Sequence, residues 1–339
     1  MDVFNHYASR YERTREEELT LKEYLELCRQ DPSVYATAAE RMLMAIGEPE
    51  MIDTRLDSRA SRIFSEQGDP VVSGIPRVLR NGGSHRTSGF VFPPRGARLE
   101  EKKQILYLLG PVGGGKSSIA EKLKELMEKV PFYCIKGSPV NESPLGLFNP
   151  DEDGAILEEQ YGIPLRYLKT IPSPWAVKRL HEFNGDINQF RVVKRYPSVL
   201  RQLAIAKTEP GDENNQDISS LVGKVDIRKL EKYAQDDPDA YSYSGGLCLA
   251  NQGLLEFVEM FKAPIKVLHP LLTATQEGNF KGTEGFGAIP FEGVILAHSN
   301  ESEWKQFRNN KKQRSLPRSY LYRQGAVLPA CDRRGQDLR

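Results

Sequence analysis

A glycine-rich stretch followed by a lysine and a serine carries the clearest chemistry in this sequence. Residues 110–117 read GPVGGGKS and fit the pattern G-x-x-x-x-G-K-S/T. An apolar run precedes the stretch and an amphipathic segment follows it, which is the strand–loop–helix context that a P-loop requires. Glycines let the backbone N–H groups turn inward around a triphosphate. The expected phosphate-binding set is Gly110, Gly113, Gly114, Gly115, Lys116, Ser117 and Ser118.

Two members of this set have distinct expected roles. Lys116 would reach the β and γ phosphates, and the Ser117 hydroxyl would bind Mg²⁺. The sequence therefore predicts ATP and Mg²⁺ as cofactors. The alternative is a glycine-rich strand-to-helix turn that binds no ligand.

A second apolar run ends in acidic residues. Residues 250–259 read ANQGLLEFVE, similar to a form of the acidic strand in several AAA+ subfamilies. Glu259 falls on the position of the catalytic glutamate, whereas Val258 stands where an aspartate is expected. Glu256 lies two residues earlier and faces the same side of a strand, so it could supply the metal-side carboxylate instead. The alternative is that Glu256 and Glu259 are surface acids.

Asn300 closes a further apolar run, residues 293–300. It resembles the sensor-1 residue of AAA+ proteins, which orients the attacking water, and we predict a catalytic role for it beside Glu259 and Glu256. The alternative is an asparagine that serves a turn at a strand end. His269 and His298 receive no role, because no nucleophile in the sequence is paired with either.

The elements that must position these residues alternate between apolar runs and helical periodicity. A helix is expected at 117–129, and residues 150–243 are expected to be polar and mostly helical. Buried strands are expected at 104–109, 130–137, 254–260 and 293–300. This alternation predicts an α/β fold with a doubly wound parallel sheet of the P-loop NTPase (AAA+) type.

The N-terminal part predicts a small helical region. Two helices are expected within residues 15–47. Thr20 and Glu23 form a capping box for the first, Asp31 with the proline after it would begin the second, and Gly47 would end it.

Composition narrows the class of protein. The chain has 339 residues, with 47 Lys plus Arg against 46 Asp plus Glu, so no overall charge favours nucleic acid. No apolar run approaches the roughly 20 residues that span a bilayer. The N-terminus is too polar for a signal peptide, and the four cysteines form no CxxC pair. We therefore expect a cytoplasmic protein that binds neither membrane nor nucleic acid.

Four longer segments make the resemblance to a family specific. They are GPVGGGKSS, KGSPVNESPLGLF, ANQGLLEFVEMFKAPIKVLHPLLTATQEGNF and FEGVILAHSNESEW, and they resemble the N-terminal AAA+ region of the PrkA serine protein kinases. The resemblance covers residues 1–65 and 98–310. It implies ATP-dependent phosphorylation of Ser or Thr in a protein substrate, a further C-terminal kinase region, and a possible homo-oligomer. The common kinase motifs H-R-D and D-F-G are absent from this sequence.

Two other functions remain open. One is an ATP-sensing interaction module without catalysis, which Val258 favours. The other is an AAA+ remodelling or proteolytic machine, for which the sequence shows no protease nucleophile pattern.

Two segments interrupt the resemblance, residues 66–97 and 311–339. The first is rich in Gly, Pro and Arg and contains no Lys. The simplest reading is a flexible linker, but a shift of the reading frame restores family-like text in both segments, including F-L-D-R, which resembles an arginine finger. We therefore expect a helical region at 1–65, an AAA+ core at 98–310, two poorly ordered frameshifted segments between and after them, and a chain that is inactive as written.

Overall fold

The computed structural model describes most of the chain, and its longer gaps lie at 52–69, 73–104, 307–326 and 330–339. The described residues are 3–13, 15–47, 49–51, 70–72, 105–109, 115–209, 218–263, 265–283, 285–300, 302–303, 305–306 and 327–329. The segments 66–97 and 311–339 are described only at residues 70–72 and 327–329. The expected lack of order in these segments therefore lies outside the described residues.

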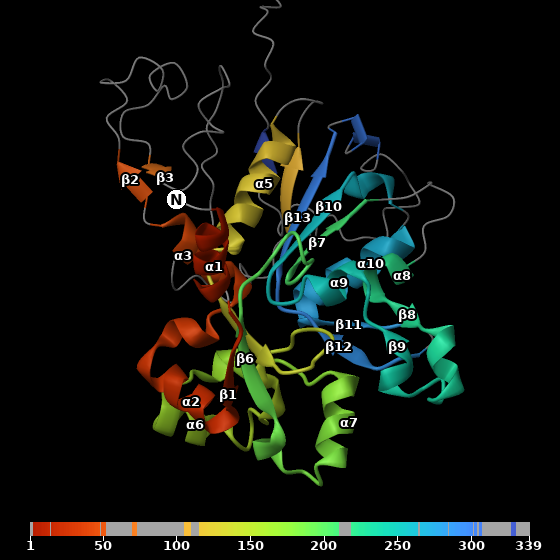
Figure 1. The fold of residues 1–339 in the computed structure, drawn as a ribbon. Coiled ribbons are helices and arrows are strands. Elements are labelled where there is room, and N and C mark those ends of the chain that lie inside the picture. The colour runs from red at the N-terminus through yellow and green to blue at the C-terminus, as the bar shows by residue number, and fades with distance from the viewer. Residues whose placement is uncertain are drawn as a thin grey trace, which may run out of the picture.

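A five-stranded parallel sheet forms the centre of the molecule (Figure 1). Its strands lie in the order β14-β4-β13-β10-β7, and every neighbouring pair is parallel. Their bounds are β14 Val327–Pro329, β4 Ile105–Leu109, β13 Val294–Ser299, β10 Leu254–Val258 and β7 Ile205–Thr208. This arrangement confirms the predicted α/β fold and the predicted strands at 104–109, 254–260 and 293–300.

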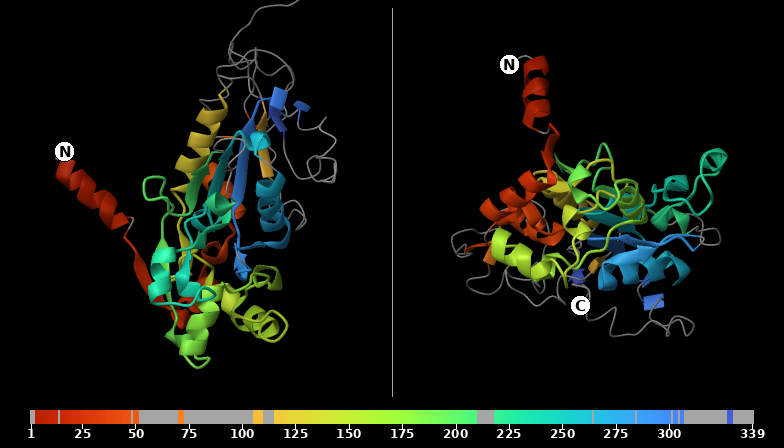
Figure 2. Two further views of the ribbon diagram at one scale, coloured as in Figure 1. Left: turned by 90° about the vertical axis from the view of Figure 1, so that its right-hand side faces the viewer. Right: turned by 90° about the horizontal axis from the view of Figure 1, so that it is seen from below.

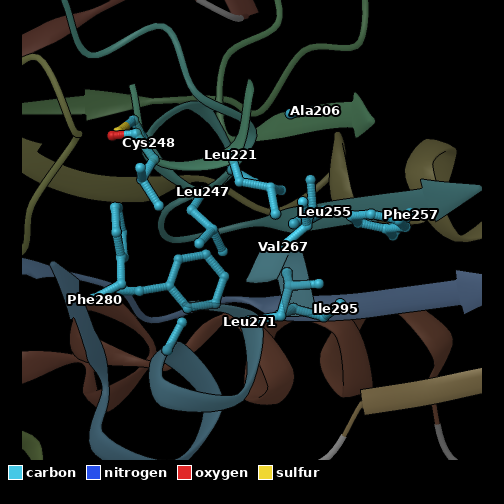
Figure 3. Close-up of a cluster of buried hydrophobic side chains, with 14 of the residues drawn as sticks. Ala206, Leu221, Leu247, Cys248, Leu255, Phe257, Val267, Leu271, Phe280 and Ile295 are labelled. Carbon is cyan, nitrogen blue, oxygen red and sulfur yellow. The ribbon is translucent and has the colours of Figure 1, made fainter. Parts of the chain in front are cut away.

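Helices cover both faces of this sheet (Figure 2). On one face, Leu106, Leu254 and Leu296 pack with Leu123 and other apolar residues of α5 (Lys116–Met127) and with α3 (Ala38–Ile46). On the other face, strand residues such as Leu255 and Phe257 pack with α8 (Ser219–Val222), α9 (Gly246–Leu249) and α10 (Ile265–Glu277) (Figure 3). Because successive strand residues face opposite sides and both faces are covered, these strands are mostly apolar. Glu256 in β10 and His298 in β13 are buried polar exceptions.

A smaller antiparallel sheet corrects one expectation. Residues 132–135 form a strand, β5 (Phe132–Ile135), but it pairs antiparallel with β6 (Arg191–Arg195), which in turn pairs with β1 (Glu17–Thr20). The prediction that 130–137 is the next strand of the parallel sheet is therefore wrong. Both faces of β5 are buried, Tyr133 in one apolar cluster and Phe132 in another. An apolar run of this length cannot reveal whether its partners are parallel.

The prediction that residues 150–243 are mostly helical is also wrong. The region contains α6 (Gly154–Tyr161) and α7 (Pro174–Glu182), but also β6, β7 and a hairpin of β8 (Lys224–Val225) with β9 (Tyr241–Ser242). The edge strand of the main sheet, β7, has four residues with the sequence IAKT, too few to show a period.

The N-terminal helices follow the predicted capping, with one change. Thr20 and Glu23 form the capping box that begins α2 (Leu21–Gln30), as predicted. Asp31 caps a 3-10 turn, η1 (Pro32–Tyr35), rather than the next helix, because α3 has its own capping box at Thr37 and Glu40. Gly47 ends α3 with φ +86°, as predicted. The remaining described elements are α1 (Val3–Arg13), β2 (Pro49–Met51), β3 (Pro70–Val72), β11 (Asn279–Lys281), β12 (Ala288–Pro290), η5 (Pro144–Leu147), η6 (Leu165–Tyr167), η7 (Ile187–Gln189), η8 (Ile227–Glu231), η9 (Pro238–Ala240) and η10 (Met260–Lys262).

Candidate functional site at the carboxyl edge of the sheet

Strand register brings the three sequence motifs to one edge of the parallel sheet. Ser299 pairs with Leu109, and Val258 pairs with His298. The residues that follow these strand ends are the start of the glycine-rich stretch, Asn300 and Glu259. Since β13 lies between β4 and β10, the candidate residues from all three motifs are neighbours at the carboxyl end of the sheet. This is the edge at which open α/β sheets bind ligands.

The described part of the glycine-rich stretch fits a phosphate group. Gly115 precedes α5 with φ +83°, and a Cβ built on it would have no atom within 4 Å. Lys116, Ser117 and Ser118 form the first turn of α5, which contains no acidic residue. The N–H groups and positive dipole of a helix start attract anions, so the geometry suits a phosphate. The predicted Gly110, Gly113 and Gly114 lie outside the described residues.

Glu259 and Asn300 belong to one hydrogen-bonded network. The Glu259 carboxylate lies 2.8 Å from Lys262 Nζ, and Lys262 Nζ lies 3.4 Å from the Glu303 carboxylate. Glu303 accepts hydrogen bonds from the Asn300 backbone N–H and side-chain amide, each at 3.3 Å, and from the Ser299 hydroxyl. The hydrogen bond to Glu259 is the main cause that raises the pKa of Lys262. A single ammonium group therefore links the ends of β10 and β13.

The backbone at Glu259 supports a functional role for this residue. Glu259 has φ +49° and ψ +42°, the left-handed region that non-glycine residues rarely adopt. Such strained positions cluster at functional sites. The side chain is 44% exposed, so it can reach a ligand at the edge of the sheet.

Glu256 lies deeper than its predicted metal role suggests. One carboxylate oxygen accepts a hydrogen bond from Lys124 Nζ at 2.8 Å, and the other lies 2.9 Å from His298 Nε2. Burial alone would raise the pKa of Glu256, but the hydrogen bonds with His298 and Lys124 outweigh burial and hold this pKa below its ordinary value. Each carboxylate oxygen of Glu256 already has one partner and the side chain is 3% exposed, so a metal ion would have to approach a buried, hydrogen-bonded carboxylate. That role stays a prediction, and the two bonds argue against it.

The Asn-Gln-Gly segment before β10 is bonded at the opposite, amino edge of the sheet. The Asn251 side chain accepts N–H groups from Gln252 and Glu292 and donates to the Val140 carbonyl. A Cβ on Gly253 would lie 1.6 Å from the Ala204 carbonyl oxygen, so only glycine fits there. This part of the motif therefore builds the fold and lies away from the candidate site.

A cavity of about 290 Å³ also lies at the amino edge. Its wall includes Tyr35, Thr37, Gln252 and Glu292. The residues predicted to do chemistry do not line it, so cavity size and predicted chemistry point to opposite edges of the sheet.

Comparison with known proteins identifies the family of this chain. A family model described as the PrkA AAA domain matches residues 19–321. The chain belongs to the PrkA AAA domain family. This result confirms the predicted family.

Two curated relatives carry different names. The chain is 61% identical over 349 aligned residues to the "Serine/threonine kinase YeaG" of Escherichia coli (strain K12), covering 100% of this chain and 53% of the relative. It is 35% identical over 319 residues to the "ATP-dependent protease PrkA" of Bacillus subtilis (strain 168), covering 90% of this chain and 48% of the relative. The PrkA AAA domain chain thus spans about half the length of these relatives.

Solved structures add little to this assignment. A reconstruction of the complex between subunits BchI and BchD of magnesium chelatase matches with 18% identity and a TM-score of 0.36. The match covers 59% of this chain and 48% of the other. A likeness at this level carries no argument about function.

The structure adds four residues that the sequence did not single out. Lys262 and Glu303 connect the two strand ends, and Lys124 and His298 hold Glu256. His298 precedes Asn300 by two residues, so its place on the same strand face could be read from the sequence, whereas Lys124 could not be matched to Glu256 without knowing which sheet face α5 covers. No nucleophile in the sequence is paired with His298, but in the structure its Nε2 lies 2.9 Å from Glu256.

Two kinds of feature are absent from the described residues. Within those residues, no helix is long and apolar enough to cross a membrane. The same part of the chain shows no group of three or more His, Cys, Asp or Glu side chains arranged to hold a metal ion.

Proposed function

We propose that this chain is the ATP-binding AAA+ module of a PrkA-like serine/threonine protein kinase. In this proposal, the module couples ATP binding and phosphoryl transfer to phosphorylation of a protein substrate. The observation that carries the proposal is the convergence of the α5 start, Glu259 and Asn300 at one edge of the parallel sheet. A kinase-named relative with 61% identity supports the choice of reaction.

Each of the described residues of the candidate site has one role in the proposed reaction. Gly115 and the N–H groups of the first turn of α5 hold phosphate oxygens, and Lys116 neutralises the β and γ phosphates. Mg²⁺, held through the Ser117 hydroxyl, supplies charge neutralisation at the phosphates. Glu259 accepts the proton of the attacking hydroxyl, which belongs to water or to a protein Ser or Thr, and Asn300 orients that hydroxyl.

Substitution of Lys116 tests the binding step. Lys116→Ala removes a charge-assisted contact, so ATP should bind about 10–100-fold more weakly. The matched control is Lys122→Ala on the same helix, where the lysine pairs with Glu125 at the surface. Titration of both variants with a fluorescent ATP analogue makes the comparison. Equal affinity of the Lys116 variant and the parent chain would contradict the P-loop assignment.

A test of ATP turnover requires a version of the chain in which the reading frame is restored. We propose that the reading frame is shifted over residues 66–97 and 311–339, so the F-L-D-R arginine is missing and the chain as written is inactive. Loss of such an arginine costs roughly 10³–10⁵ in rate. Turnover is therefore measured on a frame-restored chain of equal length beside the chain as written. Equal turnover of the two, or genomic DNA that cannot encode the restored text, contradicts the shift.

A second candidate function follows from the other relative and from Val258. The relative from Bacillus subtilis is named an ATP-dependent protease, and a missing aspartate before Glu259 favours an ATP sensor. The full-length frame-restored protein with labelled ATP and a mixed protein substrate separates these functions. Labelled phosphoprotein supports the kinase, peptide fragments support the protease, and binding without either product supports the sensor.

A further inference from the structure

We propose that Lys124, Glu256 and His298 form a buried positioning cluster that fixes the P-loop helix against the two strands that carry the proposed catalytic residues. The inference rests on the proposed function, because it assigns the cluster to the geometry of that same site. It gives Glu256 a positioning role in place of the metal role predicted from the sequence.

The three side chains are almost fully buried between α5 and the sheet. The exposed fractions are 5% for Lys124, 3% for Glu256 and 8% for His298. Lys124 donates to Glu256 at 2.8 Å and also to Glu121 at 2.6 Å, and Glu256 Oε1 lies 2.9 Å from His298 Nε2. Lys207 on β7 is a further charge near Glu256. The cluster therefore joins one helix to two adjacent strands through charged groups.

Buried charges of this kind hold geometry more than they add stability. Removing one partner leaves an unpaired buried charge and is strongly destabilising, whereas apolar replacement of the whole group is often neutral. Burial would lower the pKa of Lys124, yet hydrogen bonds to Glu121 and Glu256 raise it, so the lysine stays charged. A charged, directional contact permits fewer relative positions of α5 and the strands than apolar packing does.

Each member of the cluster lies a short, rigid distance from a site residue. Lys124 follows Ser117 by about two turns of α5, which is roughly 10 Å of helix. Glu256 precedes Glu259 on and just beyond β10, and His298 precedes Asn300 at the end of β13. These offsets keep the cluster away from the reacting atoms. It can act only by setting the positions of Ser117, Glu259 and Asn300 relative to one another.

The test compares single and combined substitutions in the full chain. Lys124→Met or Glu256→Gln alone should lower the unfolding temperature by several degrees. The combined variant Lys124→Met, Glu256→Leu and His298→Leu should recover most of this loss, because no buried charge remains unpaired. The control is Lys178→Met, which removes a partly buried lysine from Asp237 and Asp239 elsewhere in the fold.

The deciding readout is a distance between spin labels at Glu125→Cys on α5 and Ser302→Cys beyond β13, with Cys331 replaced by serine. The other cysteines, Cys28, Cys134 and Cys248, are buried. The combined variant should show a shifted or broadened distance distribution, and the control should match the parent chain. In the frame-restored chain, the combined variant should keep its affinity for ATP and lose roughly 10–100-fold in turnover, as expected for a small misplacement.

The outcomes separate this inference from the proposed function. A combined variant with recovered stability and the parent distance distribution overturns the inference, whatever the chain does with ATP. If that variant does not fold, the distance in Glu256→Gln decides instead, and an unchanged distribution overturns the inference. A changed distance, together with a frame-restored chain that does not hydrolyse ATP, supports the cluster and contradicts the proposed reaction.

Discussion

The two edges of the parallel sheet use polar side chains in different ways. At the amino edge, Asn251 and Gln252 are buried and hydrogen bond mainly to backbone groups of distant segments. At the carboxyl edge, Glu259 and Lys262 are partly exposed and bond to other side chains. At these two edges, the buried bonds to backbone groups fix the fold, whereas the partly exposed side chains bonded to one another can change partners when a ligand arrives. Neighbouring parts of one sequence motif can therefore serve architecture and chemistry separately.

Gly253 should give the largest effect, at the amino edge. Gly253→Ala places a Cβ 1.6 Å from a backbone oxygen that cannot move without displacing β7, so we expect a loss of more than about 4 kcal/mol in the free energy of unfolding, or no folded protein. Gly154→Ala is the control, because its Cβ meets only the flexible end of Leu165. Circular dichroism with urea unfolding measures both. A Gly253→Ala chain as stable as its control would show that the amino edge tolerates displacement.

Glu259 should give the largest chemical effect, at the carboxyl edge. Glu259→Gln in the frame-restored chain removes the proposed base, so turnover should fall about 10²–10⁴-fold while ATP binding is retained. The unfolding free energy should change by less than about 0.5 kcal/mol, as for an exposed residue. Phosphate release and ATP titration, measured together, check this. Normal turnover would place the base on another residue.

Substitution of Asn251, at the amino edge, should have an effect of intermediate size on stability. Asn251→Ala removes the side-chain acceptor of the Glu292 N–H group and the donor to the Val140 carbonyl, whereas the Gln252 N–H group keeps the Glu292 carbonyl as acceptor, so we expect a cost of about 2–4 kcal/mol in the free energy of unfolding. ATP affinity of the folded fraction should not change, because this edge lies away from the candidate site. Weakened ATP binding at temperatures where the variant is fully folded would show that the two edges are not independent.

Lys262 should give the smallest effect on stability. Its ion pairs with Glu259 and Glu303 are partly exposed, so Lys262→Met should change the free energy of unfolding by less than about 1 kcal/mol. The change should shrink further in high salt, which screens exposed charges. Urea unfolding at low and high ionic strength tests this, and a loss as large as that of Asn251→Ala would show that both edges are fixed by buried bonds.

The sequence predicted the parts of this fold that have a strong local pattern. The apolar runs that end at Leu109, Val258 and Ser299 are long enough to identify as strands, and their motifs located the candidate site. The short strand β7 and the partner of β5 were not predicted, because a four-residue strand shows no period and an apolar run does not reveal its partner.

Side-chain partners within the site were harder to predict than its location. Lys262 follows Glu259 by three residues, a spacing that is common on surfaces and carries no particular signal. The bond between Glu256 and Lys124 depends on which sheet face meets α5, which only the packed structure shows. Long-range pairs of this kind leave no mark in local composition.

The pairing of β4 with β13 has a consequence for how the protein is made. Ile105 pairs with Ile295, so the strand before the P-loop waits for a partner that is synthesised about 10–40 s later at ordinary rates of translation. The antiparallel strands β5 and β6 are closer to each other along the chain and can pair earlier. During that interval the apolar strand β4 leaves the ribosome without its neighbours, which is when chaperones bind exposed segments. The carboxyl edge of the main sheet is therefore among the last parts of this fold to assemble during translation.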